Sequence, residues 1–362
     1  MPLEAAALPA AASTNAGTLI TTDVVVVGAG PVGLFQIFEL GLLGLQAHVV
    51  DALPHVGGQC AELYPDKPIY DIPGIRACTG RELSERLQQQ AAPFAPVYHL
   101  GQQVEQLQRL KDGRLLLRTS AGTGFITRSL ILAAGVGAFV PRALKVDGVD
   151  ALLGSQLFYH PHQLEQASGR RTIVLGGDEA AVCAAVACAT VHGAAHTTLL
   201  HRRDVFTGPD ALLAQLADLR AQGRIEVVAG QPAALQCGAD GRLQALDVTL
   251  PDGSTQALPA DLLLAYLGIS PKLGPIAEWG LELERKQIPV DTARYATAEA
   301  GIYAVGDINT YPGKRKLILC GFHEATLAAF AVAEQLSGQS PLLQYTTSSS
   351  HLHALLGVQG AD

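Results

Sequence analysis

The segment from residue 23 to residue 59 constrains the fold more than any other part of the chain. It reads DVVVVGAGPVGLFQIFELGLLGLQAHVVDALPHVGGQ, in which four valines precede a glycine-rich turn. An apolar segment of helical length follows, and then a second β-branched run that ends at Asp51. This order predicts a strand, a tight turn, a helix and a second strand, the first βαβ unit of an α/β fold.

The glycines of this turn have the spacing of a dinucleotide-binding unit. Gly28 permits the sharp turn, Gly30 allows a diphosphate to approach the backbone, and Gly33 allows the helix to pack closely on the strand. The helix N-terminus offers free N–H groups and the positive end of the helix dipole. Asp51 is placed to accept hydrogen bonds from the ribose hydroxyls of an adenine dinucleotide. The alternative is a glycine-rich turn with a structural role alone.

Composition argues against several other classes of protein. A chain of 362 residues is long enough for two domains, and its net charge of -8 argues against binding to nucleic acid. No segment approaches the roughly eighteen uninterrupted apolar residues of a membrane span. Residues 1–20 contain no Lys or Arg, so they lack the charged start of a secretory signal, and we expect a mobile tail there. The six cysteines form no CxxC pair and no metal-ligand cluster, which favours reduced thiols in a cytoplasmic protein.

The chain repeats the first pattern further on. Residues 171–200 read RTIVLGGDEAAVCAAVACATVHGAAHTTLL, which predicts another strand, glycine turn, alanine-rich helix and strand. Two such units in one chain predict two bound nucleotides. In this repeat Gly177 takes the place of the second glycine and Leu175 stands where the first would be, so we expect a less tight turn.

The two units end in different side chains. The first ends in Asp51 and the second in Arg202 and Arg203. An acid suits a free ribose 2′-hydroxyl, whereas two guanidinium groups suit a 2′-phosphate through charge-assisted, bidentate contacts. The arginine pair therefore predicts an NADP-type nucleotide at the second unit. The alternative is a solvated arginine pair at the end of a strand.

A further cluster lies towards the carboxyl end of the chain. Residues 297–307 read TAEAGIYAVGD and precede an apolar helix predicted at 323–336. Asp307 can bind a ribityl hydroxyl while the helix N-terminus faces the phosphates, or it can simply cap the helix. The other predicted elements are a helix at 81–90, antiparallel strands between 99 and 132 with a turn at Asp112–Gly113, and strands between 223 and 268.

Three longer motifs carry a family resemblance. They are GGQCAELYPDKPIYDIPG at 57–74, GDINTYPGKRKLILCGFHEA at 306–325 and QYTTSSSHLHALLGV at 344–358. With the two glycine turns, they resemble the two-dinucleotide-fold flavoprotein reductases and, within them, the ferredoxin–NADP reductases of the thioredoxin-reductase-like type. The resemblance implies an α/β fold of two Rossmann-like three-layer dinucleotide-binding domains. An FAD-binding domain at 21–140 and 280–362 would be split by an inserted NADPH-binding domain at 141–279.

The resemblance also implies which residues contact FAD. They are Asp51 at the adenosine ribose, Val104 at the adenine through its backbone, Gln59, Tyr64 and Phe139 at the flavin, and Asp307 at the ribityl chain. Tyr64 would stack on one face of the flavin ring and Tyr345 on the other, with Thr346 and Thr347 nearby, from the same or a second subunit. A homodimer is therefore implied.

Two absences from the motifs predict where electrons go. Relatives of glutathione reductase carry a second cysteine five positions after the equivalent of Cys60, where this chain has Pro65. Thioredoxin reductases carry CxxC before the second glycine turn, where residues 159–162 read YHPH. Electrons would therefore pass from NADPH through the flavin to an external carrier, ferredoxin or flavodoxin. We expect this acidic carrier to dock by charge on the basic cluster Lys314–Lys316.

Two alternatives stay open at this point. One is an NADPH-dependent flavin reductase of a small disulfide or quinone, and the other is a non-enzymatic flavin-binding sensor. Activity with a quinone but not with ferredoxin favours the first, and failure of NADPH to bleach the flavin favours the second. The departures from the family pattern at Leu175 and Thr207–Gly208 both fall in the NADPH half.

Overall fold

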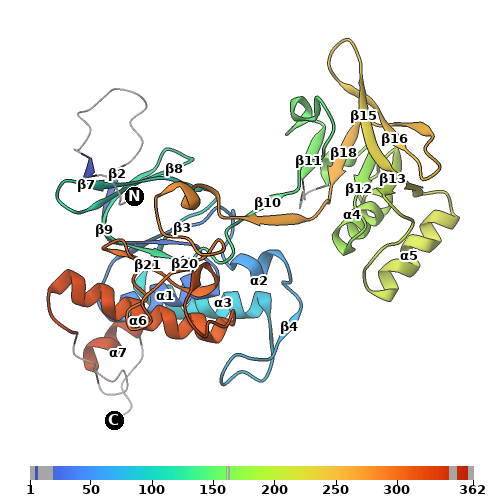
Figure 1. The fold of residues 1–362 in the computed structure, drawn as a ribbon. Coiled ribbons are helices and arrows are strands. Elements are labelled where there is room, and N and C mark those ends of the chain that lie inside the picture. Colours follow the sequence, from blue (N-terminus) through green and yellow to red (C-terminus); the bar gives the residue numbers. More distant parts are fainter. Residues whose placement is uncertain (1–4, 7–18, 160, 162–163, 342–348, 358–362) are drawn as a thin grey trace. The chain divides into compact units, whose positions relative to one another are not determined.

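Two compact units make up the chain. In the computed structural model, which describes residues 5–6, 19–159, 161, 164–341 and 349–357, unit 1 comprises Met1–Ala138 and Pro271–Asp362, and unit 2 comprises Phe139–Ser270 (Figure 1). The chain passes between them in β10 (Ala138–Pro141) and β19 (Ile269–Lys272), which pair as a two-stranded sheet. Most of the expected tail, residues 1–4 and 7–18, lies outside the described residues, and β2 already begins at Leu19.

Unit 1 contains most of the strands and the longest helix. Its strands are β1 (Ala5–Ala6), β2 (Leu19–Val27), β3 (Ala47–Val50), β4 (Pro68–Ile69), β5 (Cys78–Thr79), β6 (Val97–His99), β7 (Val104–Leu110), β8 (Leu115–Thr119), β9 (Gly124–Leu132), β20 (Ile288–Pro289), β21 (Ile302–Ala304) and β22 (Asn309–Thr310). Its helices are α1 (Pro31–Leu42), α2 (Gly58–Glu62), α3 (Gly80–Ala91), α6 (Ile318–Ser337) and α7 (Ser350–Leu356), with 3-10 turns η1 (Ala92–Phe94), η4 (Gly274–Glu278) and η5 (Gly306–Ile308).

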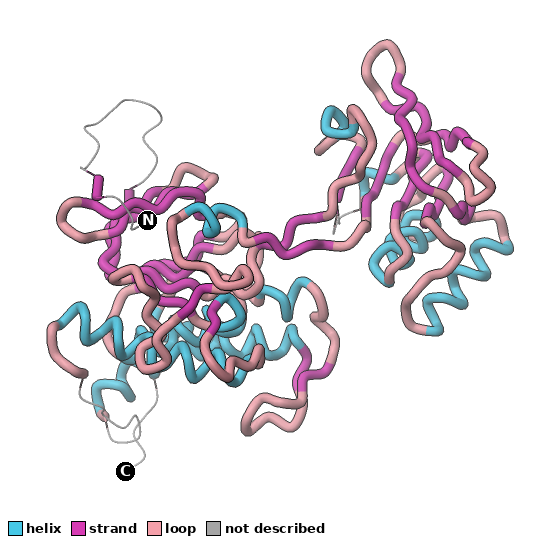
Figure 2. Tube along the Cα trace, viewed as in Figure 1, coloured by secondary structure: helices cyan, strands magenta, loops and turns pink. Residues whose placement is uncertain are grey.

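The valines of β2 explain the layering of unit 1. The main sheet has the order β1-β7-β8-β9-β2-β3-β6, with β21 also paired to β9, and β6, β3, β2, β9 and β21 run parallel. Because side chains alternate along a strand, Val25 faces one side of the sheet while Val24 and Val26 face the other. One side is covered by the β7–β8 hairpin and the other by α1, α3 and α6 (Figure 2).

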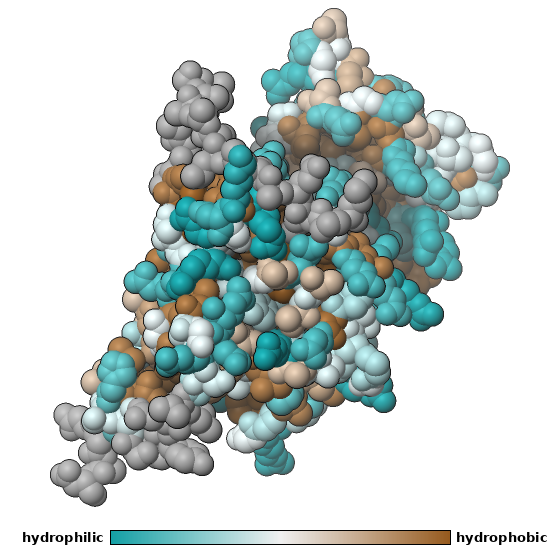
Figure 3. Space-filling model, turned by 60° about the vertical axis from the view of Figure 1, so that its left-hand side comes forward, coloured by the Kyte–Doolittle hydropathy of each residue, from teal (hydrophilic) through white to brown (hydrophobic). Residues whose placement is uncertain are grey.

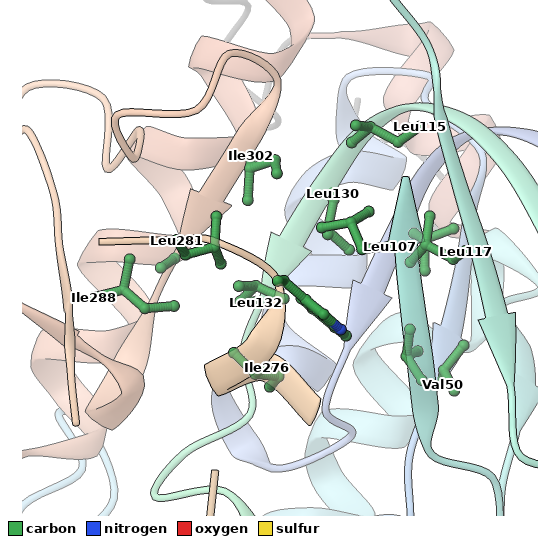
Figure 4. Packing of buried hydrophobic residues seen from close by; sticks show 14 of the residues in the cluster. Val50, Leu107, Leu115, Leu117, Leu130, Leu132, Ile276, Leu281, Ile288 and Ile302 are labelled. Carbon is green, nitrogen blue, oxygen red and sulfur yellow. The ribbon is translucent and has the colours of Figure 1, made fainter. Parts of the chain in front are cut away.

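The core on the hairpin side joins the two chain segments of unit 1. Figure 4 shows Leu107 of β7 beside Leu130 of β9, with Leu132 of β9 and Ile276 of η4 in the same cluster. Trp279 is also buried in this cluster, so residues 271–279 pack in the core of unit 1.

Two predicted elements of unit 1 are confirmed together with their local causes. The helix predicted at 81–90 is α3, and Thr79 and Glu82 form a capping box at its start, each side chain accepting the other's backbone N–H. The turn at Asp112–Gly113 joins β7 to β8, with Gly113 at a φ of 87°. The helix predicted from 323 begins earlier, at Ile318, whose side chain packs against the core.

Unit 2 repeats the same architecture. Its strands are β11 (Leu157–Tyr159), β12 (Arg171–Leu175), β13 (His196–His201), β14 (Glu226–Ala229), β15 (Gln231–Cys237), β16 (Leu243–Thr249), β17 (Thr255–Pro259) and β18 (Leu262–Ala265), and its helices are α4 (Glu179–Thr190), α5 (Asp210–Ala221) and the 3-10 turns η2 (Val149–Leu152) and η3 (Glu165–Ala167). A parallel sheet of order β11-β18-β12-β13-β14 lies between the β15-β16-β17 sheet and the helices. Ile173 and Leu175 face the small sheet, and Val174 faces α4 and α5.

The expected α/β fold with two Rossmann-like three-layer units is therefore confirmed. Within the described ranges, no helix is both long enough and apolar enough to cross a membrane.

Candidate functional site

The candidate site of unit 1 lies at the carboxyl ends of β2, β3, β9 and β21, where parallel strands deliver their following residues to one edge of the sheet. Gly28 follows β2 with a φ of 111°, and a Cβ there would lie 2.3 Å from the carbonyl oxygen of Ala133, which follows β9. A Cβ on Gly33 would lie 1.9 Å from the carbonyl oxygen of Gly28. Packing of strand, turn and helix therefore requires glycine at both positions.

Gly30 differs from its two neighbours, because packing does not require it. Its φ is -71°, and among the described residues a Cβ there would come within 4 Å only of the Cα of Gly58, at 3.8 Å. Gly30 is the N-cap of α1, which has no side-chain cap and no acidic residue in its first turn. The open space and the uncapped, uncharged helix N-terminus fit the diphosphate of a dinucleotide such as FAD.

Asp51 lies beside this turn and is tied to it. Its Oδ2 accepts a hydrogen bond from the Ala29 N–H at 2.6 Å, and its Oδ1 accepts one from the Leu53 N–H at 2.8 Å. Burial raises the pKa of Asp51, and the two N–H groups partly offset this effect. Each carboxylate oxygen keeps a further lone pair for a ribose hydroxyl. The Gln102 N–H donates to the Asp51 carbonyl at 3.0 Å. This bond places Val104, the first residue of β7, near the edge of the sheet where Asp51 lies.

Gln59, Cys60 and Tyr64 lie on and just after α2. A Cβ on Gly135 would lie 3.2 Å from the Gln59 Nε2, so this amide reaches the end of β9. The Cys60 thiol donates to the Tyr64 hydroxyl oxygen at 3.7 Å. Burial raises the pKa of both groups, which keeps the thiol and the phenol protonated at neutral pH.

Asp307 joins this group from the far end of the sequence. It lies in η5, which follows β21. Burial is the main cause of the raised pKa of Cys60 and Tyr64, and the negative charge of the Asp307 carboxylate is a smaller cause. The Gln287 Nε2 donates to its backbone carbonyl at 3.1 Å. No ion pair or hydrogen bond from the described residues engages the Asp307 carboxylate, which is therefore available as an acceptor for a ribityl hydroxyl.

Four predicted flavin contacts stay predictions. Tyr345, Thr346 and Thr347 lie outside the described residues. Phe139 belongs to β10, and its side chain also lies outside the described part of the molecule.

The second glycine turn corrects one expectation from the sequence. Gly176, not Leu175, holds the position equivalent to Gly28. Its φ is 151°, its N–H bonds to the end of β13 at Leu200, and a Cβ on it would lie 2.4 Å from the Tyr266 carbonyl oxygen. The turn is therefore as tight as the first, and Leu175 is an ordinary buried residue of β12.

The departure from the glycine motif falls instead at Asp178. This residue is the N-cap of α4, the place that Gly30 has in α1, and its Oδ1 accepts from the Ala181 N–H at 3.0 Å. Glu179 adds a second acid in the first turn. The N-terminus of α4 thus carries its own negative charge, which reduces its attraction for a diphosphate. The glycine pattern alone predicts the motif one residue too early, from Leu175, and so does not predict the role of Asp178.

Arg202 and Arg203 follow β13, as predicted for the end of the second unit. Both are exposed, and no ion pair in the described part of the chain uses either. The His201 Nδ1 lies 2.9 Å from the Arg203 carbonyl oxygen, and its ring would be 2.6 Å from a Cβ on Gly177. His201 therefore links Gly177 to the arginine pair. The pair fits a 2′-phosphate, whereas the acidic start of α4 fits the diphosphate less well.

The basic cluster Lys314–Lys316 presents two positive charges at the surface and not the expected three. The side chain of Lys314 is only 8% exposed and forms an ion pair with the fully buried Glu324, so it cannot serve as a surface charge. Arg315 and Lys316 are exposed. The sequence indicated neither the pair nor the role of Glu324.

Comparison with known proteins places the chain in a family. It belongs to the pyridine nucleotide-disulphide oxidoreductase family, whose model matches residues 22–328. The chain is 62% identical to the ferredoxin–NADP reductase of Acidovorax sp., over 96% of this chain and 99% of the relative. It is 57% identical to the ferredoxin–NADP reductase of Paracidovorax citrulli, over 95% of this chain and 98% of the relative.

Solved structures agree on the fold. The crystal structure of T. acidophilum thioredoxin reductase matches with a TM-score of 0.57 at 20% identity, over 88% of this chain and 99% of that one. The resemblance to ferredoxin–NADP reductases of the thioredoxin-reductase-like type is therefore confirmed.

Proposed function

We propose that this chain is a ferredoxin–NADP reductase that exchanges electrons between NADPH and ferredoxin or flavodoxin, with FAD held in unit 1 and NADPH in unit 2. Family membership and the 62% identical relative support the activity. Bound FAD would accept a hydride from NADPH and release its electrons one at a time. The protein's own part is to bind and orient: the start of α1 receives the diphosphate, and Asp51 and Asp307 receive hydroxyl groups.

The observation that carries this choice of acceptor is the state of Cys60. The thiol is buried, and that burial raises its pKa. It forms a hydrogen bond with Tyr64 and no disulfide bond with a second cysteine. A protonated thiol is a poor nucleophile, and Pro65 stands at the spacing where a disulfide partner is found in related reductases. With FAD bound, electrons would therefore pass to an external carrier rather than through Cys60.

The proposal includes a homodimer in the cytoplasm, as the family resemblance and the free cysteines suggest. The stacking of Tyr64 on one flavin face and of Tyr345 on the other, with Thr346 and Thr347 nearby, belongs to the same proposal. Light scattering of the purified holoprotein measures the oligomeric state directly.

Anaerobic mixing tests the proposed activity. NADPH added to the FAD-loaded protein is expected to bleach the visible absorbance of the flavin, and ferredoxin or flavodoxin added next is expected to restore it. Absence of bleaching would support a sensor instead. Reoxidation by a quinone or a small disulfide, but by neither protein carrier, would support the alternative reductase.

Cys60→Ala separates the two enzyme classes. We expect the variant to keep ferredoxin turnover within about twofold, because no electron passes through the thiol. A disulfide reductase that uses Cys60 would instead lose its activity, so a large loss in this variant contradicts the proposal.

A further inference from the structure

A buried ion pair holds the peptide that precedes Asp307. Glu324 lies in the second turn of α6 and is fully buried, and the side chain of Lys314 is 8% exposed. The Lys314 ammonium donates to the Glu324 Oε1. Because removal of two charges from water is costly, such a pair is tolerated only when further hydrogen bonds satisfy both groups.

Among the described residues, the further hydrogen bonds of the pair go to the loop 306–314. The Glu324 Oε2 accepts from the Gly306 N–H at 2.7 Å and from the Asn309 Nδ2 at 2.8 Å. Its Oε1 also accepts from the Tyr311 hydroxyl at 2.9 Å. The Lys314 Nζ donates to the Gly306 carbonyl at 2.9 Å. The N–H and the C=O of Gly306 are thus each bonded to one member of the pair.

Gly306 lies beside the first turns of α1 and α6. Its φ is 77°, and a Cβ on it would lie 3.4 Å from the side chain of Val32, in the first turn of α1. A Cβ on Gly321, in the first turn of α6, would lie 2.4 Å from the same side chain. The orientation of Gly306 therefore sets where the next residue, Asp307, stands relative to both helix N-termini.

We propose that the Lys314–Glu324 pair is a positioning device for FAD, which holds the Gly306 peptide so that the Asp307 carboxylate meets the ribityl hydroxyl. This inference rests on the proposed FAD site and assigns a role to the motif at 306–325 beyond Asp307 itself. The Asp307 carboxylate has no partner among the described residues, so its direction depends on its backbone, and the pair fixes that backbone.

A purely structural pair is the competing explanation, and the choice of variants separates the two. Replacement of Lys314 alone or of Glu324 alone leaves a buried charge without its partner, which destabilises the fold whichever explanation is correct. The double variant Lys314→Met/Glu324→Gln removes both charges at similar side-chain size, so we expect the apoprotein to fold. It lacks the donor to the Gly306 carbonyl, and we expect its FAD dissociation constant to rise by about 10- to 150-fold, the equivalent of one hydrogen bond to a charged group.

The decisive measurement is a double-mutant cycle with Asp307→Ala, in which apoprotein is titrated with FAD and flavin fluorescence is recorded. If the pair acts through the Asp307 carboxylate, the double change should weaken FAD binding by less than about threefold in the Asp307→Ala background. Arg128→Met is the matched control. It removes an ion pair with Asp23 and a contact to the Leu336 carbonyl at the other end of α6, and it should alter FAD affinity by less than about twofold.

Two results would overturn the inference. One is an equal loss of FAD affinity with and without the Asp307 carboxylate, and the other is an apoprotein that fails to fold even in the charge-free double variant. Failure of the unaltered apoprotein to bind FAD would instead defeat the proposed function. Tight FAD binding with additive effects defeats this inference alone.

Discussion

Gly28, Gly30 and Gly33 have the same side chain but meet different demands. A Cβ on Gly28 or Gly33 would overlap backbone atoms of the protein, whereas a Cβ on Gly30 has open space at an ordinary φ. At the level of single residues, the first turn thus contains two glycines that packing requires and one, Gly30, that packing does not require and that we propose serves the FAD diphosphate. The division turns a sequence motif into a set of distinguishable variants.

Gly30→Val should abolish FAD retention without unfolding the apoprotein. The branched side chain would occupy the space open to the diphosphate, and loss of glycine at an N-cap costs only about 1 kcal/mol or less. Gly33→Val should fail to fold, since its Cβ would lie 1.9 Å from the Gly28 carbonyl oxygen. Bound flavin after purification and the thermal midpoint of the apoprotein are the two measurements. A yellow Gly30→Val protein would show that the diphosphate lies elsewhere.

At the level of elements, the two βαβ units share a backbone but differ in electrostatics at the start of the helix. The N-terminus of α1 has no cap and no acid, and that of α4 has Asp178 as its cap and Glu179 in its first turn. A negative charge at a helix N-terminus contributes about 0.3 to 2 kcal/mol of favourable interaction energy. In α4, Asp178 and Glu179 already place negative charge at this position. We therefore expect unit 2 to bind its nucleotide mainly through Arg202 and Arg203.

Asp178→Gly should strengthen binding of NADPH and NADH by the same factor, about 2- to 30-fold, because the diphosphate is common to both. The double change Arg202→Ala/Arg203→Ala should instead lower the preference for NADPH by about two to four powers of ten, since each arginine can donate to the 2′-phosphate. The dissociation constants of NADPH and NADH, measured for each variant, test both expectations. A shift in the NADPH-to-NADH ratio in Asp178→Gly would contradict the assignment of this residue to the diphosphate.

Elements were predictable where the cause is local, and much less so where it is distant. The helix predicted at 81–90 and the turn predicted at Asp112–Gly113 are each set by residues close together in the chain, so the local sequence pattern sufficed to predict them. The end of β12 is set by its pairing with β13 and β18, so local sequence could not tell whether Leu175 or Gly176 begins the turn. A lysine is usually exposed. The burial of Lys314 depends on its ion pair with Glu324, a contact that the packing of α6 produces and the local sequence does not indicate.

At the level of the whole molecule, the chain carries a net charge of -8 yet is proposed to bind acidic carriers. The basic groups that remain exposed beside the start of α6 are Arg315 and Lys316, with Leu317 and Leu319 also 45% and 43% exposed. Figure 3 shows hydrophobic and hydrophilic residues interspersed over the face displayed. Local positive charge with apolar neighbours near the predicted flavin site can steer an acidic partner even when the overall charge is negative.

Charge reversal at Arg315 and Lys316 should therefore slow electron transfer to ferredoxin by about tenfold at low ionic strength and flatten its dependence on salt. Reduction of the flavin by NADPH should stay unchanged, because we propose that the nucleotide binds in unit 2. The matched control is charge reversal at Lys111 and Arg118, two exposed residues of the β7–β8 hairpin, which gives the molecule the same net charge. Stopped-flow rates of both half-reactions, measured over a range of salt concentrations, decide between local and global effects. If both variants slow ferredoxin equally, overall charge and not this surface governs docking; if the NADPH step slows as well, Arg315 and Lys316 serve FAD binding or folding.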